Sequence, residues 1–429
     1  MHGIIIFCIM ITMFSFNGCQ TASNLLHTAI IPQSYNYLKE SPVAKCDFAS
    51  ALQEVQNSKS PFLKNAELGL LLFYQKNFNR SKTFFEKAIS LYRKDESKPL
   101  LALSDYTVLD YMAEGYDKVF LHNYNALNYL LMGDLENAKV ETKNSDFIQQ
   151  KERERFYKEI RNYKSLKHID RTLLNRYEKL FSRVDSSHNP YQNPFSFYIS
   201  SLIFEEEGRL DDAAIDLRHA LHYAPDSGFL HKRLEQYDKN NPISKRVELF
   251  FDIGRSPVKT QERVPVKVSK EKELRLYLPS FVLYLSQIDK IVLLDKKNNV
   301  IAVSHTLSDI NAIKINAFRK MLPFMLDKIF KEVSKEMLGD TIARQNSLIG
   351  PVYNFLKVLY SQNNILSWTS LPQRIDVISF IPQINQEYML EARDKNARVL
   401  DRIVFQVNCS EKLKNCYRHY VLKKDKFCK

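Results

Sequence analysis

The chain has 429 residues, of which 45% are hydrophobic, and its formal net charge is +13 at pH 7. This length allows two or three domains, and the apolar fraction is sufficient for packed cores. Glycine is scarce, at 10 residues. Because neither a P-loop nor a G-x-G-x-x-G fingerprint occurs, the sequence argues against a doubly wound nucleotide-binding fold.

Residues 1–18 have the pattern of an export signal. The run from Ile4 to Phe16 is almost wholly apolar, but a transmembrane helix needs about 20 apolar residues, so we expect the h-region of a signal peptide. Gly18 before Cys19 resembles the lipobox of bacterial lipoproteins, in which cleavage leaves a lipid-bearing cysteine at the new N-terminus. The resemblance implies lipidation of Cys19, and a plain signal peptide or a short anchor is the alternative.

Residues 19–45 mix Ser, Asn, Pro and Tyr without a sustained period, and we expect them to form a tether. The residue after Cys19 is Gln20 rather than Asp. By resemblance to well-studied lipoproteins, this implies the outer membrane. Together these features predict a lipid-anchored protein of the bacterial cell envelope, on the outer membrane and facing the periplasm.

Residues 46–242 are expected to be helical and contain three segments with one shared pattern. Apolar positions recur at helical spacing on both sides of a turn, with small residues where two helices would approach closely. The positions are Leu68, Gly69, Phe78, Ser81, Phe85, Ala88 and Ile89 in the first segment, Ala126, Tyr129, Gly133, Leu135 and Ala138 in the second, and Gly208, Ala213, Leu217, Ala220 and Pro225 in the third. The pattern resembles the tetratricopeptide (TPR) repeat, a helix–turn–helix unit of about 34 residues. An ordinary bundle of helical hairpins is the alternative.

Such repeats imply a binding surface. One unit cannot bury its own apolar face, so neighbouring units stack into a curved solenoid whose concave surface binds a peptide or a protein. Polar residues crowd one predicted helix of the second unit, at His122, Asn123, Tyr124, Asn125 and Asn128. These residues are candidates for lining a binding groove; the alternative is that they form hydrogen bonds between packed helices.

After Tyr237 the composition changes, and residues 238–242 read as a linker. We expect residues 243–429 to form an α+β domain of antiparallel strands, helices over about 307–361, and further strands. Pro323 is expected to kink the first of these helices, and a second helix is expected over 342–360. The predicted fold class is therefore α+β and multidomain: an N-terminal TPR-like α-helical solenoid followed by an antiparallel β-rich domain with a helical insertion.

Several segments resemble a family of uncharacterised bacterial TPR-like lipoproteins. They are Tyr116–Tyr129, Gly133–Glu141, Gly254–Lys259, Leu278–Phe281 and Trp368–Ile375, in this order along the chain. Members of this family have no established enzymatic activity, so the resemblance implies an architecture more than a reaction. In the last segment Trp368 and Arg374 are candidate binding residues, although a large residue such as Trp368 can equally lock a domain core.

The cysteines predict disulfides. Apart from those in the signal and at the lipidation position, the chain contains Cys46, Cys409, Cys416 and Cys428. In an oxidising periplasm an even number suggests disulfides, and four cysteines allow three pairings. Cys409 with Cys416 closes a short loop and is our first choice, and Cys46 with Cys428 would then join the two ends. A metal site is less favoured because the spacing lacks a CxxC pair.

The basic excess lies mainly in residues 151–183 and in the tail after Glu411. A basic surface attracts polyanions, and for an exported protein these would be anionic lipid or glycan and not nucleic acid. A solvated surface without a partner is the alternative. We also expect the adjacent Glu205, Glu206 and Glu207 to form a solvated helix face, because neighbours on a helix point different ways.

The sequence shows no nucleophile or metalloprotease motif, and it predicts no enzyme, no cofactor and no metal. The predicted function is a cell-envelope lipoprotein whose helical repeats bind partner proteins as a scaffold or assembly factor. The alternative is an accessory protein that binds peptidoglycan or surface-polysaccharide machinery through its basic surface.

Overall fold

The computed structural model describes residues 41–429 except 59, 96–110, 112, 163–170, 239–243, 268–272, 340–365, 384–385, 408, 410–411 and 429. The predicted signal, most of the tether, Cys19 and the helix expected over 342–360 therefore lie outside the described residues. Within the described part of the chain, no helix is long and apolar enough to cross a membrane.

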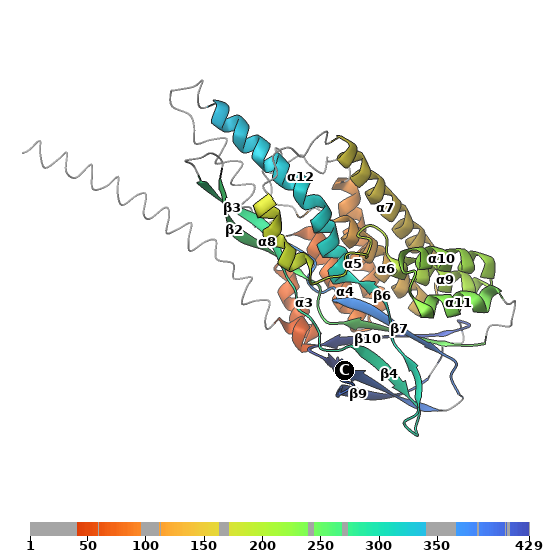
Figure 1. The fold of residues 1–429 in the computed structure, drawn as a ribbon. Coiled ribbons are helices and arrows are strands. Elements are labelled where there is room, and N and C mark those ends of the chain that lie inside the picture. Colours follow the sequence, from red (N-terminus) through yellow and green to blue (C-terminus); the bar gives the residue numbers. More distant parts are fainter. Residues whose placement is uncertain are drawn as a thin grey trace, which may run out of the picture.

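The first half consists of helices that pair as hairpins (Figure 1). After the 3-10 helix η1 (Pro42–Lys45) come α3 (Phe48–Gln56), α4 (Pro61–Tyr74), α5 (Phe78–Asp95), α6 (Gly115–Met132), α7 (Leu135–Asn162), α8 (Arg171–Phe181), α9 (Pro194–Glu207), α10 (Leu210–Tyr223) and α11 (Gly228–Asp238). The hairpins α4–α5, α6–α7 and α9–α10 correspond to the three predicted units. Gly133 and Gly208 end α6 and α9 in the left-handed conformation that favours glycine, so the two predicted turns are confirmed.

Among the described residues, the second half is built of strands and the long helix α12. It contains β1 (Val247–Ile253), β2 (Val258–Lys267), β3 (Glu273–Val282), β4 (Lys290–Leu294), β5 (Val300–Val303), β6 (His305–Asp309), α12 (Ile310–Gly339), β7 (Arg374–Phe380), β8 (Glu387–Arg393), β9 (Val399–Gln406), β10 (Cys416–Lys423) and β11 (Lys426–Phe427). The predicted α+β class is confirmed. Helix α12 runs on through Pro323.

The strands form three sheets. The central sheet has the order β11-β10-β1-β7-β6, the second sheet has the order β5-β4-β8-β9, and β2 and β3 form a hairpin. Most neighbours are antiparallel, as predicted, but β1 and β10 are parallel. Only a tight hairpin forces two strands to run antiparallel. The connection from β1 to β10 is far longer than a hairpin, so it allows the two strands to run in the same direction.

The central sheet lies between the helices and the second sheet. On β1 the side chains of Val247, Leu249, Phe251 and Ile253 share a core with residues of the second sheet. Phe250, on the opposite face of β1, belongs to the core that the helices form. Figure 1 shows the same arrangement, with β7 and β10 between the helical hairpins and strands β4 and β9. Strand β1, in the middle of the central sheet, is therefore covered on both faces, which explains why it is buried at every position.

The helix core continues across the expected boundary at residues 242 and 243. It unites side chains of α4, α6 and α9 with Phe250 and Val377 of the central sheet, and with Trp368. The secondary structure changes at this point in the sequence, but the hydrophobic core does not end there. The predicted domain ranges, 46–242 and 243–429, remain predictions.

Both predicted disulfides are present. Cys409 is bonded to Cys416, and Cys46 is bonded to Cys428 across a separation of 382 residues. The second bond joins the beginning of the helical half to the last strand hairpin. It closes almost the whole described chain into one covalent loop.

Candidate functional site: the inner face of the helical array

The helical hairpins form two layers. Helices α4, α6 and α9, which we call the inner helices, are buried on nearly all sides; in α6 every residue from Tyr116 to Leu130 is buried. The outer helices α5, α7 and α10 each keep an exposed side. Gly69 lets the layers approach closely, since a Cβ atom there would lie 2.5 Å from the ring of Phe85. The inner helices together form the inner face of the array, and this is the face on which a binding groove was expected.

The polar candidates on α6 point at other helices. His122 lies between the hydroxyl of Tyr92, at 2.7 Å, and the carboxylate of Glu141. Asn125 donates to the same carboxylate at 3.0 Å. Both candidates are 0% exposed. The pairing gives both side chains hydrogen-bond partners inside the helical array.

Two further candidates connect neighbouring hairpins. Asn123 donates to Ser196 of α9 at 2.8 Å. Asn128 donates to Ser81 of α5 at 2.9 Å, and Ser81 in turn donates to the carbonyl of Gly69. These residues hold the units together, which is the alternative that the sequence left open. None of the four polar residues of this set on α6 lines an exposed groove.

The strand β1 covers the inner helices. Its residues Glu248, Phe250 and Asp252 face them in turn, at the period of two that a strand imposes. The hydroxyl of Tyr198 on α9 donates to Glu248 at 2.8 Å. Phe250 lies 6.1 Å from Phe195 between ring centroids. The chain's own central sheet thus occupies the face that the repeats were expected to offer to a partner.

Asp252 is the centre of a first buried charged cluster. Tyr74 of α4 and Tyr124 of α6 both donate to its Oδ2 atom, at 2.8 and 2.7 Å. His419 of β10 lies 3.1 Å from its other oxygen and stacks on the Tyr74 ring. Tyr124, the remaining candidate on α6, therefore joins the helices to the sheet and does not face solvent.

Lys423 belongs to the same cluster. Its ammonium group donates to the carbonyl of Gly254 at 2.6 Å and lies 5.4 Å from the Tyr74 ring. Burial lowers the pKa of Lys423 to about 7, although Asp252 acts in the opposite direction. A lysine that is 1% exposed is rare in a protein interior.

A second cluster surrounds Glu205 at the end of α9. Arg233 of α11 and Arg246, just before β1, form ion pairs with its carboxylate, and Tyr237 donates to it. Arg233 also pairs with Glu248 at 2.8 Å. Burial would raise the pKa of Glu205, but the two guanidinium groups hold it below its ordinary value.

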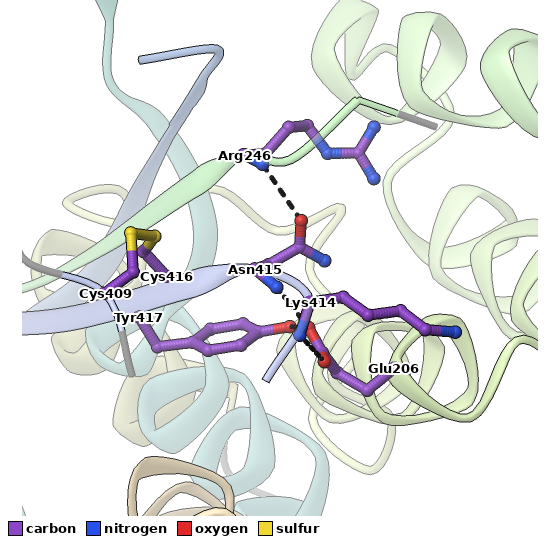
Figure 2. The surroundings of a disulfide bond; sticks show 7 residues. All are labelled: Glu206, Arg246, Cys409, Lys414, Asn415, Cys416 and Tyr417. Carbon is purple, nitrogen blue, oxygen red and sulfur yellow. Dashed lines mark hydrogen bonds between the residues drawn. A yellow bond between two sulfur atoms is a disulfide. The ribbon is translucent and has the colours of Figure 1, made fainter. Parts of the chain in front are cut away.

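Glu206 holds the loop that precedes β10 (Figure 2). Its carboxylate accepts hydrogen bonds from the backbone of Lys414 and Asn415, at 2.6 and 2.9 Å, and from the Tyr417 hydroxyl at 2.7 Å. The Cys409–Cys416 disulfide closes this loop. The expectation of a solvated face is therefore wrong for Glu205 and Glu206, which are 3% and 6% exposed. Helix α11, the residue before β1 and the loop before β10 supply partners that the sequence of α9 alone does not reveal.

Trp368 and Arg374 have structural contacts as well. Trp368 is 0% exposed; its indole donates to Ser370 at 2.9 Å, and its carbonyl accepts from the buried Lys314 at 3.2 Å. Arg374 binds Asp376 and the carbonyls of residues 288 and 289, each at 3.0 Å. Trp368 locks the core, as the alternative interpretation held. Cys409, Cys416, Cys46 and Cys428 form the disulfides described above.

Sequence reasoning missed the charged residues of the sheet. Glu248 and Asp252 accept hydrogen bonds from the inner helices, and Lys423 lies over the ring of Tyr74, yet none of the three was a candidate. The signal was present in the run V-E-L-F-F-D-I, where two acidic residues interrupt a strand that is otherwise apolar. Such residues in a strand buried on both faces must find partners, because an unpaired buried charge is costly.

The two clusters connect different parts of the fold to one another. Their charges are paired or hydrogen-bonded, and some of these contacts join a helix to the central sheet, such as Tyr124 with Asp252 and Arg233 with Glu248. Among the described residues, no group of three His, Cys, Asp or Glu side chains could hold a metal ion. A pocket of about 290 Å³, counted with its open mouth, lies beside the start of α6. Glu152, which lines it, is already paired with Lys118 at 2.9 Å.

Comparison with known proteins supports the repeat assignment. The tetratricopeptide repeat family model matches residues 65–95, which comprise most of α4 and all of α5. The first of the three predicted units is thus a tetratricopeptide repeat. A solved structure, the Arabidopsis OM64 TPR domain, is similar at 15% identity over 41% of this chain and 93% of that chain, with a TM-score of 0.24. A similarity this low carries no argument. No curated protein matches the sequence.

Proposed function

We propose that this chain is a non-enzymatic lipoprotein of the bacterial cell envelope whose helical repeats bind partner proteins as a scaffold or assembly factor. The observation that carries the proposal is the tetratricopeptide repeat at residues 65–95, because repeats of this kind present extended surfaces to other proteins. The lipid anchor rests on the sequence around Cys19. The buried clusters support a structural role for the charged residues, since their groups pair with one another.

The outer helices offer the surface for a partner. The inner face is covered by the central sheet, whereas α7 exposes Val140, Phe147 and Tyr157, at 52%, 62% and 52%. Val140 and Phe147 are two helical turns apart and lie on the same side of α7. Ile215 of α10 is 47% exposed. Large apolar side chains on an outer face favour a partner that buries apolar side chains against them.

Affinity capture from native envelope membranes tests the proposal. The variant Val140→Ser/Phe147→Ser alters the outer face of α7, and Val300→Ser/Val404→Ser alters residues of similar exposure on the second sheet as a control. We expect defined protein partners with the wild type and the control, and their loss with the α7 variant. Equal recovery with all three proteins would contradict the assignment of this face.

The anchor is tested separately by fractionation of Cys19→Ala. We expect the wild type in the membrane fraction, and the variant released or unprocessed. Identical fractionation of both proteins would contradict lipidation at Cys19. Recovery of insoluble wall polymer in place of protein partners would favour the accessory role in peptidoglycan or surface-polysaccharide machinery.

A further inference from the structure

Helix α7 presents an exposed row of side chains along most of its length, which we call the α7 stripe. Its members recur at alternating intervals of three and four residues, and they are Val140, Lys143, Phe147, Gln150, Glu154 and Tyr157. This alternation is the heptad spacing with which one helix packs along another. Three of the six side chains are apolar or aromatic and more than half exposed. The α7 stripe therefore has the spacing of a helix-packing surface.

The α7 stripe faces away from the protein's own core. The opposite side of the helix packs into the fold through Ala138, Ser145 and Ile148, which are all buried. Lys143 and Glu154 are exposed, and neither has an ion pair or hydrogen bond within the part of the chain that the structure describes. Apolar side chains of this size beside unpaired charges favour a helix that comes from another molecule.

The α7 stripe is complementary to itself when two copies of the helix run antiparallel. A twofold axis through the middle of the stripe brings together positions at equal distances before and after that point, and every contact then occurs twice. The register matches the layers of an antiparallel helix pair, in which the two apolar heptad positions face each other. The resulting pairs are Lys143 with Glu154, Val140 with Tyr157, and Phe147 with Gln150.

Charge decides the direction of this pairing. In a parallel pair each residue meets its own copy, so Lys143 would face Lys143 and Glu154 would face Glu154. Like charges in such positions repel. The antiparallel register converts both into pairs of opposite charge. Asp146 and Arg153, which border the stripe on one side, come next to each other in the same register.

We propose that a second copy of this chain binds the α7 stripe, so that two copies pair through α7 in the antiparallel register. The inference rests on the proposed function, which gives the outer face of α7 to a partner, and it names that partner. Because each copy contributes only three large apolar side chains, we expect a dimer that dissociates in the micromolar range. Such a dimer would present the other outer helices, α5 and α10, twice, which suits a scaffold.

Sedimentation velocity tests the pairing by charge reversal. The purified full chain with Cys19→Ala, which removes the lipid, is measured over a range of concentrations with both disulfides intact. Lys143→Glu places like charges opposite each other at two symmetric positions, so the dimer should weaken on the order of tenfold or more. Glu154→Lys should have the same effect. The double variant Lys143→Glu/Glu154→Lys restores opposite charges and should dimerise like the parent.

A matched control and a cross-linking experiment make the test specific. Lys296→Glu makes the same change of charge in the exposed turn between β4 and β5, and it should dimerise like the parent. A mixture of Lys143→Cys and Glu154→Cys proteins should form an intermolecular disulfide, whereas neither variant should do so alone. In the antiparallel pair the two copies of position 143 are separated by about 16 Å along the helix, at 1.5 Å per residue.

Three results would each overturn the pairing: a parent protein that remains monomeric, a double variant that is not restored, or single-cysteine variants that cross-link with themselves. These measurements need no other protein, so their failure is distinguishable from failure of the proposed function. A monomeric chain that still captures other proteins through α7 would leave the proposed function standing and remove the second copy as its partner.

Discussion

Tyr124 of α6 donates a hydrogen bond of 2.7 Å to Asp252 of β1, across 128 positions of sequence. Tyr74 of α4 donates to the same oxygen. Two inner helices are thereby attached to one carboxylate of the central sheet. This relationship explains why the inner face of the repeats is closed: the sheet binds it with buried polar groups as well as with apolar packing.

Replacing Tyr124 with Phe is expected to destabilise the fold. The change leaves a buried carboxylate with one donor fewer, and a lost hydrogen bond to a charged group costs about 1.5 to 3 kcal/mol. Tyr157→Phe is the control, because Tyr157 is 52% exposed, and it should change the stability by less than about 0.5 kcal/mol. Urea unfolding measures both. Equal stabilities of the two variants would show that the Asp252 contact contributes nothing.

Two neighbouring glutamates on α9 should respond very differently to truncation. Glu205→Ala leaves the guanidinium groups of Arg233 and Arg246 buried without this partner, a change that typically costs about 3 to 5 kcal/mol. Glu207 pairs with Lys139, and both side chains keep partial contact with solvent, at 24% exposure for Lys139 and 18% for Glu207, so Glu207→Ala should cost about 1 kcal/mol. Thermal unfolding followed by circular dichroism distinguishes these outcomes. A similar loss at both positions would argue that burial at Glu205 is not decisive.

The stability of the protein should rise as the pH increases from about 7 to about 9.5, through Lys423. Its pKa is near 7 in the folded protein and about 10.4 in an unfolded chain, so the unfolded state binds more protons in this window. The slope contributed by one such group is at most about 1.4 kcal/mol per pH unit. Lys423→Met should flatten it. Urea unfolding at several pH values tests this, and an unchanged slope in Lys423→Met would contradict the assignment.

The two disulfides should contribute different amounts to the free energy of unfolding. Cys46–Cys428 closes a separation of 382 residues and Cys409–Cys416 one of 7. In the chain-entropy description, loss of the long closure costs on the order of 6 kcal/mol and loss of the short one about 2 kcal/mol. Cys46→Ser/Cys428→Ser should therefore unfold at a much lower denaturant concentration than Cys409→Ser/Cys416→Ser. The reverse order would mean that local strain or residual structure outweighs chain entropy.

The sequence by itself determined the local structure. The spacing of apolar residues predicted the helical hairpins, Gly133 and Gly208 marked turns that need a left-handed backbone, and the change after Tyr237 marked the start of the strands. These features depend on residues a few positions apart, so they can be predicted from the sequence. The pairing of Cys46 with Cys428 was also predicted, because the short Cys409–Cys416 loop left only those two.

Only the tertiary structure decided what the inner face of the repeats does. Whether His122, Asn128 and Tyr124 meet a partner or other parts of the chain depends on contacts between residues far apart in sequence. The same holds for Glu205, whose guanidinium partners come from α11 and from the approach to β1. The amino-acid type of a polar residue is the same whether it faces a partner protein or another part of its own chain. Its role depends on which groups the fold brings within about 3 Å, and hydrogen bonding acts only at that range.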